Sequence, residues 1–324
     1  MIPKDDTVDV SVVAPVYNEE GNLNQLNAAL VEALELLGRP FEVLYVDDGS
    51  TDGSLAVLRN LAERDRRIRV LVFRRNFGQT AALAAGIDHA LGDIIVTLDT
   101  DLQNDPRDIS TLVAKMAEGY DIVCGWRKER RDSWVRRLSS WGANRLVRVI
   151  SGLRLHDIGC TLRACRADLL KEVSLYGEMH RFIPVYGHQL GARICEIPVH
   201  HYSRQQGKAK YGLARTPKVM LDLLVLLLFG SYLTRPIHFF GGIGGIMVGA
   251  GLFCGILVLH DIFTDPEAKA HKNPLLLLAV FLALLGAQMV LMGLLAELLT
   301  RVYHESRGKR IYRLRETINF PHPG

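Results

Sequence analysis

The sequence predicts an α/β domain with a doubly wound sheet, followed by an interface helix and two membrane-spanning helices. Two observations predict this fold class. Up to about residue 215, short apolar runs alternate with longer helix-like stretches, and charged and apolar residues are mixed as in a soluble domain. From residue 236 onwards, two long stretches contain almost no charged residue. Alternating strands and helices are typical of a sheet covered by helices on both faces, whereas apolar runs of about 20 residues are typical of membrane spans.

Residues 1–215 form the predicted α/β domain. Its strands are expected in the apolar runs VDVSVVAPVY, FEVLYVDDGS, IRVLVFR, DIIVTLD and YDIVCG. These runs are continuous rather than alternating, as expected for parallel strands that are buried on both faces. Helices are predicted between them, at residues 18–37, 51–66, 78–91 and 106–118. Ligands bind at the carboxyl ends of the strands in such a sheet, and the polar motifs APVYNEE, VDDGSTDGS, RRNFGQ and DTDLQ follow those ends.

The remainder of the chain predicts a membrane hairpin. Residues 236–260 contain no Asp, Glu, Lys or Arg, and the only charged residue in 274–299 is Glu297. The connection at residues 261–273 has no excess of Lys or Arg, whereas residues 300–324 form a basic tail that is rich in Arg. Positive residues stay on the cytoplasmic side of a membrane. Both ends of the hairpin are therefore predicted to be cytoplasmic, and its connection external.

Residues 216–235 are predicted to form an amphipathic helix at the membrane interface, because this apolar stretch is interrupted by Asp222 and closed by Arg235. A third full span is the alternative, but an odd number of spans would place the basic tail outside. In the first span, the small residues of GGIGG at 241–245 let helices approach closely. We expect this small-residue face to support a homo-oligomer, in contact with membrane lipid.

Composition excludes several classes of protein. Lys and Arg number 39 and Asp and Glu 35, so the formal net charge of +4 is too small to predict a nucleic-acid partner. The five cysteines show no CxxC spacing and are predicted to be reduced thiols of a cytoplasmic domain, rather than a zinc site or a disulfide framework. The polar, acidic start MIPKDDTVDV predicts no signal peptide.

The motif VTLDTDLQN aims two carboxylates at one place. Residues i and i+2 of a strand face the same side, so Asp99 and Asp101 are expected to point together. Their like charges require a cation, a hydrogen-bond cage or a raised pKa. The first strand ends in PVYNEEGN, without the GxGxxG pattern of a nicotinamide enzyme, and the sequence has no P-loop. The acidic strand ends therefore favour a nucleotide diphosphate held by Mg²⁺ or Mn²⁺, since both ions prefer oxygen ligands.

Several motifs in a fixed order carry a resemblance to a known family. VVAPVYNEEGNL, VDDGSTDGS, RRNFGQTAAL and TLDTDLQNDP resemble the family 2 glycosyltransferases, which have the GT-A fold. RFIPV, EIPVHHYSRQQGKAKYG and the two C-terminal spans are similar to the polyisoprenyl-phosphate branch, which includes dolichol-phosphate mannose synthases. The likeness runs from about residue 9 to residue 310. DSWVRR, GCTLRACR and IPVHH look nearest to the bacterial undecaprenyl-phosphate aminoarabinose type.

The resemblance implies a donor site on the strand ends. The matching residues for nucleotide binding are Pro15, Tyr17, Asn18, Glu19, Asp47 and Asp48. The match for the metal and the sugar phosphate is Asp99, Asp101 and Gln103, with the two aspartates as ligands of Mg²⁺ or Mn²⁺. A second interpretation of DDGS stays open, namely an Asx-turn in which Asp48 caps the following helix while Asp47 binds nucleotide.

The resemblance also implies that the acceptor is a lipid phosphate. Many family relatives carry an acidic ED motif that supplies a general base, and this chain lacks it. A phosphate monoester, with a second pKa around 6, is already largely ionised at neutral pH and needs no base. The site must then hold two anions, one neutralised by the metal and the other by basic side chains. The candidates are Arg127 as a catalytic residue and, for the acceptor phosphate, Arg163, Arg204, Lys208 and Lys210.

We therefore expect an inverting, metal-dependent transfer of a sugar from a nucleotide sugar to undecaprenyl or dolichyl phosphate, at the cytoplasmic face of the inner membrane. The product would be a polyprenyl-phosphate-linked monosaccharide for envelope glycan or lipid modification. The resemblance favours a UDP-sugar, with a GDP-mannose-dependent mannose synthase as the alternative. A polysaccharide synthase would need the missing base and more spans. A catalytically idle sugar-nucleotide or lipid-binding subunit is the alternative from another class, and the intact Asp99, Asp101 and Gln103 argue against it.

Overall fold

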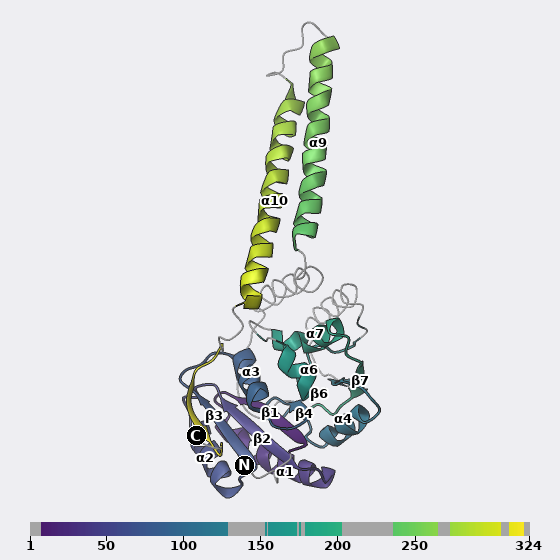
Figure 1. Cartoon of the computed structure of the whole chain (residues 1–324). Helices are drawn as coiled ribbons and strands as arrows, with labels where there is room; N and C mark the ends of the chain where they lie inside the picture. The colour runs from purple at the N-terminus through teal and green to yellow at the C-terminus, as the bar shows by residue number, and fades with distance from the viewer. Residues whose placement is uncertain are drawn as a thin grey trace. The chain divides into compact units, whose positions relative to one another are not determined.

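The computed structural model describes residues 8–128, 153, 155–173, 175, 179–202, 236–264, 273–305 and 311–320. The chain forms two compact units, one made of Met1–Leu223 with Arg310–Gly324 and the other of Leu224–Lys309. The first unit contains the sheet and its helices, and the second contains two long apolar helices (Figure 1). The C-terminal segment therefore returns to the unit in which the chain began.

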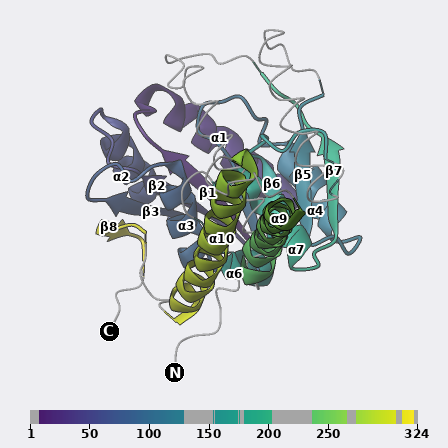
Figure 2. The ribbon, with the colours of Figure 1, turned by 90° about the horizontal axis from the view of Figure 1, so that it is seen from above.

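The described residues of the first unit form one mixed sheet. Its strands are β1 Val10–Val16, β2 Phe41–Asp47, β3 Ile68–Phe73, β4 Ile94–Thr97, β5 Ile122–Trp126, β6 Arg163–Arg166, β7 Ile194–Pro198 and β8 Leu314–Ile318. Their order is β7-β5-β6-β4-β1-β2-β3-β8, with β7 and β8 at opposite edges (Figure 2). The strands predicted from the apolar runs are confirmed as β1 to β5. The sheet is not wholly parallel, because β6 pairs antiparallel with both β4 and β5, and β8 pairs antiparallel with β3.

Helices cover both faces of this sheet. The predicted helices are confirmed as α1 Glu20–Leu37, α2 Ser54–Arg64, α3 Gln79–His89 and α4 Asp108–Met116, and the chain adds α6 Ala167–Glu172, the 3-10 helix η1 Met179–Phe182 and α7 Ile183–Gln189. α1, α2 and α4 lie on one face, and α3, α6 and α7 on the other (Figure 1). α1 and α2 begin later than predicted. Polar groups at 18 and 51 bond to each other across the two loops instead of entering the helices.

The core of the first unit has a layer on each side of the sheet. On one side, valines of β1 and β2 pack against leucines of α1 and α2. On the other side, alanines of α3 let that helix lie close to the sheet. The approach is closest at Gly86, where an added methyl group would lie 2.2 Å from Val13 Cγ1. This close packing fixes the start of α3, from which Gln79 reaches the end of β4.

The C-terminal tail was predicted to be only basic and cytoplasmic, but residues 311–320 return to the sheet as an ordered segment containing β8. Tyr312 is 3% exposed, and its ring stacks on Phe73 with centroids 5.4 Å apart. The Tyr312 hydroxyl donates to Asp88 Oδ2 over 2.8 Å. Burial of a large aromatic ring stabilises such a contact strongly. The segment is therefore an integral part of the first unit.

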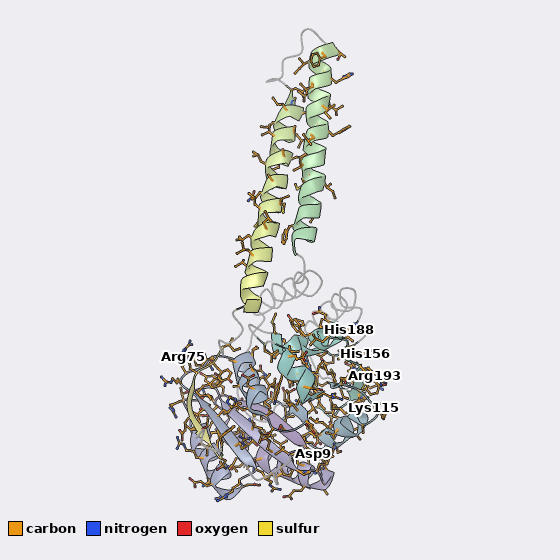
Figure 3. All side chains as sticks on the ribbon, viewed as in Figure 1. Asp9, Arg75, Lys115, His156, His188 and Arg193 are labelled. Atoms are coloured by element: carbon orange, nitrogen blue, oxygen red, sulfur yellow. The ribbon has the colours of Figure 1, made fainter. Side chains whose placement is uncertain are left out.

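The second unit contains α9 Pro236–Thr264 and α10 Pro274–Glu305. Within them, the spans Phe240–Thr264 of 25 residues and Pro274–Ala296 of 23 residues reach mean hydropathies of 2.2 and 2.6 over 18 residues, so both helices are long and apolar enough to cross a membrane. Carbon atoms make up almost all the side chains drawn on these helices, whereas charged residues such as Arg75, Lys115 and Arg193 lie on the first unit (Figure 3).

Glycines bring α9 and α10 together. An added methyl group on Gly244 would lie 2.6 Å from the Gly286 carbonyl oxygen, and one on Gly286 would lie 2.7 Å from the Gly244 carbonyl oxygen. The close packing expected of GGIGG is therefore confirmed within this pair. α9 and α10 extend beyond the predicted ends at 260 and 299. The predicted interface helix at 216–235 lies outside the described residues and stays a prediction.

Candidate active site

The loop that follows β1 interlocks with the loop that follows β2. Asn18 Oδ1 accepts the backbone N–H of Thr51 over 2.8 Å, and the Asn18 N–H donates to Ser50 Oγ over 3.0 Å. The Glu19 N–H donates to Ser54 Oγ over 2.9 Å. Asn18 has a φ of 52°, a left-handed conformation that asparagine tolerates better than most residues. Two of the predicted nucleotide-binding residues are thus tied to the acidic loop beside them.

Pro15 and Tyr17 flank this junction. The Pro15 carbonyl accepts the Thr100 hydroxyl over 2.9 Å, which links the end of β1 to the loop after β4. The Asp48 N–H donates to the Val16 carbonyl over 2.8 Å. Tyr17 is half-buried in the same turn. The predicted nucleotide-binding residues are therefore gathered on two adjoining strand ends.

Asp47 and Asp48 have different partners. Asp47 Oδ1 accepts the N–H of Ser50, three residues further along the loop, over 3.2 Å. The Asp48 carboxylate accepts the N–H groups of Phe77 and Gly78 over 2.6 and 2.9 Å. The interpretation of Asp48 as a cap of the following helix is wrong, because its carboxylate bonds to Phe77 and Gly78, and the Ser54 N–H at the start of α2 donates to Asp52 Oδ1 over 3.0 Å instead. Burial raises the pKa of Asp48 to about 6, against the two N–H donors, and the neighbouring charge of Asp47 adds to the rise.

Asp99 and Asp101 follow β4 and lie close enough for their charges to interact. Asp99 Oδ1 accepts Gln79 Nε2 over 2.7 Å. The pKa of Asp99 is raised to about 6, mainly by burial and also by the charge of Asp101. A hydrogen bond from Thr161 and the charge of Arg127 oppose this rise. The neighbouring Leu102 has a φ of 58°, a strained conformation for a residue with a Cβ, and such strain clusters at functional sites. The charges of the two carboxylates therefore interact, although both residues lie in the loop after β4, which ends at Thr97, and not on the strand as predicted.

Gln103 joins this loop to the segment after β7. Its N–H donates to Asp101 Oδ1 over 3.3 Å, and its carbonyl accepts the Tyr202 N–H over 2.8 Å. His200 is held in turn by Asp108, which accepts its N–H over 2.6 Å. The Asp-rich loop is thereby attached to residues 199–202. Arg204, Lys208 and Lys210 come directly after that segment but lie outside the described residues, so their role stays a prediction.

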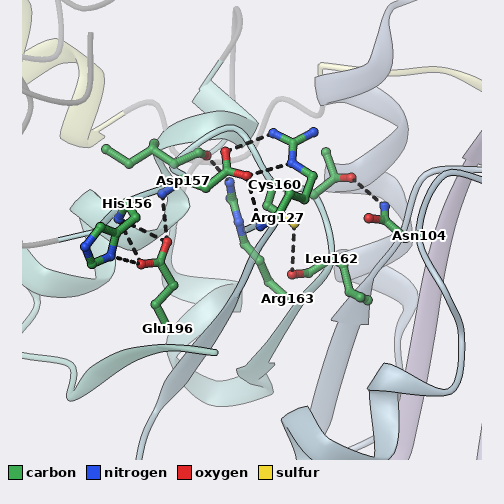
Figure 4. Close-up of polar contacts among 10 residues, drawn as sticks. Asn104, Arg127, His156, Asp157, Cys160, Leu162, Arg163 and Glu196 are labelled. Carbon is green, nitrogen blue, oxygen red and sulfur yellow. Dashed lines mark hydrogen bonds and ion pairs between the residues drawn. The ribbon is translucent and has the colours of Figure 1, made fainter. Parts of the chain in front are cut away.

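Arg127 and Arg163 occupy different settings. Arg127 follows β5, and its guanidinium binds the Asp157 carboxylate through two hydrogen bonds (Figure 4). Its charge also reaches Asp99. Arg163 is 2% exposed, and its guanidinium donates to the backbone carbonyls of Ile158, His180 and Arg181. Those contacts hold the protein backbone, so the prediction that Arg163 binds the acceptor phosphate gains no support from its surroundings.

The donor set fits a hard divalent cation. Within the described ranges, no three His, Cys, Asp or Glu side chains are grouped to hold a metal ion by themselves. Asp99 and Asp101 offer carboxylate oxygens, which Mg²⁺ and Mn²⁺ prefer. Magnesium is commonly bound by one or two carboxylates together with substrate phosphates. The pair thus matches an ion that also binds the donor diphosphate.

Gln79, Asp157 and Thr161 were not predicted as site residues from the sequence. Gln79 lies in the motif RRNFGQTAAL, and its position at the start of α3 was the available signal. Asp157 lies two residues before the motif GCTLR and Thr161 lies within it, and nothing in the local pattern shows which strand ends they meet. All five cysteines are free, as expected, and three are buried.

Comparison with known proteins identifies the family. Residues 11–174 match the model of glycosyl transferase family 2. The chain belongs to this family. A dodecaprenyl-phosphate galacturonate synthase of Rhizobium johnstonii is 40% identical to this glycosyltransferase over 321 residues, which cover 97% of this chain and 94% of the relative. An undecaprenyl-phosphate 4-deoxy-4-formamido-L-arabinose transferase of Edwardsiella ictaluri is 37% identical over 316 residues, which cover 97% and 95%.

Solved structures agree with the fold of this glycosyltransferase. A mycobacterial protein aligns with a TM-score of 0.52 and 21% identity, over 69% of this chain and 74% of the other. Glucosyl-3-phosphoglycerate synthase from Mycobacterium tuberculosis, solved with Mn²⁺, UDP and glucosyl-3-phosphoglycerate, aligns with a TM-score of 0.52 and 20% identity, over 67% of this chain and 79% of the other. The predicted GT-A fold and the predicted family are therefore confirmed.

Proposed function

We propose that this glycosyltransferase moves a sugar from a nucleotide sugar to a polyprenyl phosphate, with inversion at the anomeric carbon. One observation carries the proposal: buried Asp99, held by Gln79 over 2.7 Å, interacts electrostatically with both Asp101 and Arg127. A carboxylate pair that suits a cation thus lies near a buried arginine. The donor diphosphate and the acceptor phosphate are both anions, so the reaction requires a positive charge for each. The relatives named above, which act on dodecaprenyl and undecaprenyl phosphate, support the same acceptor class.

Each group of residues has one task in this reaction. The turn from Pro15 to Glu19 and the Asp47–Asp48 pair hold the nucleotide. Asp99 and Asp101 would hold a divalent ion, which supplies positive charge to the leaving diphosphate. Arg127 holds the acceptor phosphate, whose oxygen is already ionised at neutral pH. That oxygen forms a bond to the anomeric carbon as the bond to the diphosphate breaks, and no protein base is needed.

A divalent metal and a UDP-sugar are the favoured cofactor and donor. Glucosyl-3-phosphoglycerate synthase, which shares the fold, was solved with Mn²⁺ and UDP. The names of the relatives specify two different sugars, galacturonate and formamido-arabinose, so they support a class of sugar and not one particular sugar. Mannose from GDP-mannose is the second candidate, and GDP-mannose is one of the donors to be offered in the transfer assay.

The pairing of β8 with β3 supports a topology in which two spans start and end on the same side of the inner membrane. β8 follows α10 in the chain and β3 precedes α9, yet the two strands share one sheet. An even number of crossings is needed to return the chain to its starting side, which argues against a third full span at 216–235. The unit containing the sheet is placed in the cytoplasm by the positive-inside rule.

Self-association is the last part of the proposal. Gly242, Gly245 and Gly249 lie on α9, and an added methyl group on any of them would meet nothing within 4 Å. Small residues on a lipid-facing helix let a second helix approach closely. This face therefore supports the homo-oligomer expected from the sequence.

The test is a transfer assay with full-length protein in lipid. Radiolabelled UDP-galacturonate, UDP-glucose and GDP-mannose are offered in turn with Mn²⁺, and undecaprenyl phosphate is compared with undecaprenol. We expect label in the lipid extract only with the phosphate. Asp101→Asn should abolish transfer while the protein still folds, and Asp65→Asn, a matched change at a surface turn, should not. Transfer that persists in Asp101→Asn, or that accepts undecaprenol equally, would overturn the proposal.

A further inference from the structure

One short turn contacts both charged groups of the site. Residues 157–161 precede β6, the strand that separates β4 from β5 in the sheet. Asp157 binds Arg127 at the end of β5 (Figure 4). Thr161 is hydrogen-bonded to Asp99 in the loop after β4. The turn therefore bridges two strand ends that are not neighbours. None of its residues was expected to take part in the reaction.

The Arg127–Asp157 pair is buried and has bidentate geometry. Arg127 Nε donates to Asp157 Oδ2 over 2.6 Å, and Nη2 donates to Oδ1 over 2.9 Å. The two side chains are 13% and 8% exposed. Among the described residues, Arg127 Nη1 makes no hydrogen bond. Burial alone would lower the pKa of Arg127, but the hydrogen bonds and the charge of Asp157 outweigh it and raise the pKa. The guanidinium is therefore charged, its Nε–Nη2 edge is held by Asp157, and its Nη1 remains available to donate a hydrogen bond to a ligand.

Asp157 is itself fixed from a third strand. Glu196 of β7 accepts the Asp157 N–H at Oε1 over 2.7 Å and the His156 N–H at Oε2 over 2.8 Å. The His156 ring stacks on Trp126, with centroids 4.4 Å apart and planes at 19°. Trp126 directly precedes Arg127. The turn is thus tied to β7 through Glu196 and to β5 through the stacked rings, so the carboxylate has little freedom to move.

Two further observations separate this pair from an ordinary surface contact. Gly159 covers it, since an added methyl group there would lie 3.3 Å from Arg127 Nη2 and 3.6 Å from Asp157 Oδ1. A buried ion pair adds little to stability compared with apolar side chains of the same size, so stability alone gives a weak reason for its presence. Both Asp157 oxygens accept hydrogen bonds from Arg127, which makes Asp157 a poor general base.

We propose that Asp157 is a positioning residue for the transfer reaction. It holds the Nε–Nη2 edge of Arg127 and so presents Nη1 to an oxygen of the acceptor phosphate. Thr161, in the same turn, fixes Asp99 relative to that arginine. The inference rests on the proposed function, because it needs Arg127 to bind the acceptor phosphate. It adds a residue that acts on the reaction through Arg127.

A double-mutant cycle on transfer rate tests this route. Asp157→Asn keeps the shape of the side chain but removes the charge, and we expect transfer to fall about 10- to 100-fold, the range for a lost charge-assisted contact, with nucleotide affinity unchanged. In an Arg127→Ala background the same change should have no further effect. Asp168→Asn is the matched control, since Asp168 binds the exposed Arg166 through the same Nε and Nη2 atoms. Losses that multiply in the double variant would overturn the inference.

Chemical rescue distinguishes positioning from a merely structural role. Added guanidinium ion should restore part of the transfer by Arg127→Ala, because Asp157 can still hold it. It should restore nothing in Arg127→Ala/Asp157→Asn. Equal rescue of both variants would contradict the proposal.

A stability cycle separates failure of this inference from failure of the proposed function. If the wild type transfers no sugar to any polyprenyl phosphate, the proposed function is wrong. The thermal midpoints of the two single variants and the double variant still decide whether the Arg127–Asp157 pair exists. A change in midpoint of the double variant that differs from the sum of the two single changes would support the pair. A change equal to that sum would overturn it.

Discussion

Gly49 provides a sharp test of how the donor site is built. It lies in the DDGS loop with a φ of +68°, and an added methyl group would lie 2.6 Å from the Arg75 carbonyl carbon and 2.8 Å from the Asn76 nitrogen. Gly38, at the end of α1, has nearly the same φ of +66°, but a methyl group there would meet nothing within 4 Å. Replacing each glycine by alanine imposes the same backbone strain, and only Gly49→Ala adds a clash.

The expected size of the effect follows from these distances. A left-handed alanine costs roughly 1–2 kcal/mol at either position. At Gly49, backbone atoms must also retreat by about 0.8 Å to reach an ordinary contact of 3.4 Å. The displaced loop carries the Phe77 and Gly78 N–H groups that bind Asp48. Losing one hydrogen bond to a charged group costs about 1.5–3 kcal/mol, so Gly49→Ala should be destabilised by roughly 2.5–5 kcal/mol.

The measurement is calorimetric titration of full-length protein with UDP and GDP in the presence of Mn²⁺, together with thermal unfolding. Gly49→Ala should lose at least about tenfold in nucleotide affinity, the equivalent of one weakened charge-assisted contact. Gly38→Ala should keep its affinity and lose only the strain energy. Nucleotide affinity of Gly49→Ala within about twofold of the wild type would show that the contact between the two loops does not build the donor site.

Two further predictions concern the sheet and the membrane hairpin. Glu42→Gln leaves the buried Arg69 guanidinium without its counter-charge, at a cost of about 3–5 kcal/mol. Buried Cys165 should then react with a maleimide at least about 100-fold faster. The control Glu35→Gln, in an exposed pair with Arg67, should change this rate little. Equal rates in the two variants would contradict a stabilising role of the Glu42–Arg69 pair. A cysteine introduced at Ala268 should react with an impermeant thiol reagent outside intact cells and one at Gly324 should not. The reverse pattern would refute the two-span topology.

Local patterns were sufficient for the parallel strands β1 to β4 and for β5. Each is a continuous apolar run that is buried on both faces, and the polar residues at the carboxyl ends mark where the runs stop. Asp99 and Asp101 were predicted to lie together from the side-chain alternation of a strand, but β4 ends at Thr97 and both residues belong to the loop after it. The strands were therefore predictable from neighbouring residues, whereas the conformation of this loop was not.

β6, β8 and the Arg127–Asp157 pair depend on distant partners instead. β6 reads RACR and β8 reads LRETI, short segments with too few apolar residues to be recognised as strands. β8 gains its order from β3, more than 200 residues earlier in the chain. Likewise, Asp157 meets Arg127 only because β6 enters the sheet between β4 and β5. Such pairings leave no local periodicity to detect.

The position of β8 has a consequence for how the protein is made. During synthesis, β1 to β7 leave the ribosome first, then α9 and α10, and β8 only after both helices. Until β8 arrives, the outer edge of β3 has unpaired N–H and C=O groups, which are a template for another strand. If the hairpin crosses the bilayer twice as proposed, this edge closes only after the chain has returned to the side from which it started. A nascent chain whose insertion fails would then keep an open strand edge, which favours aggregation.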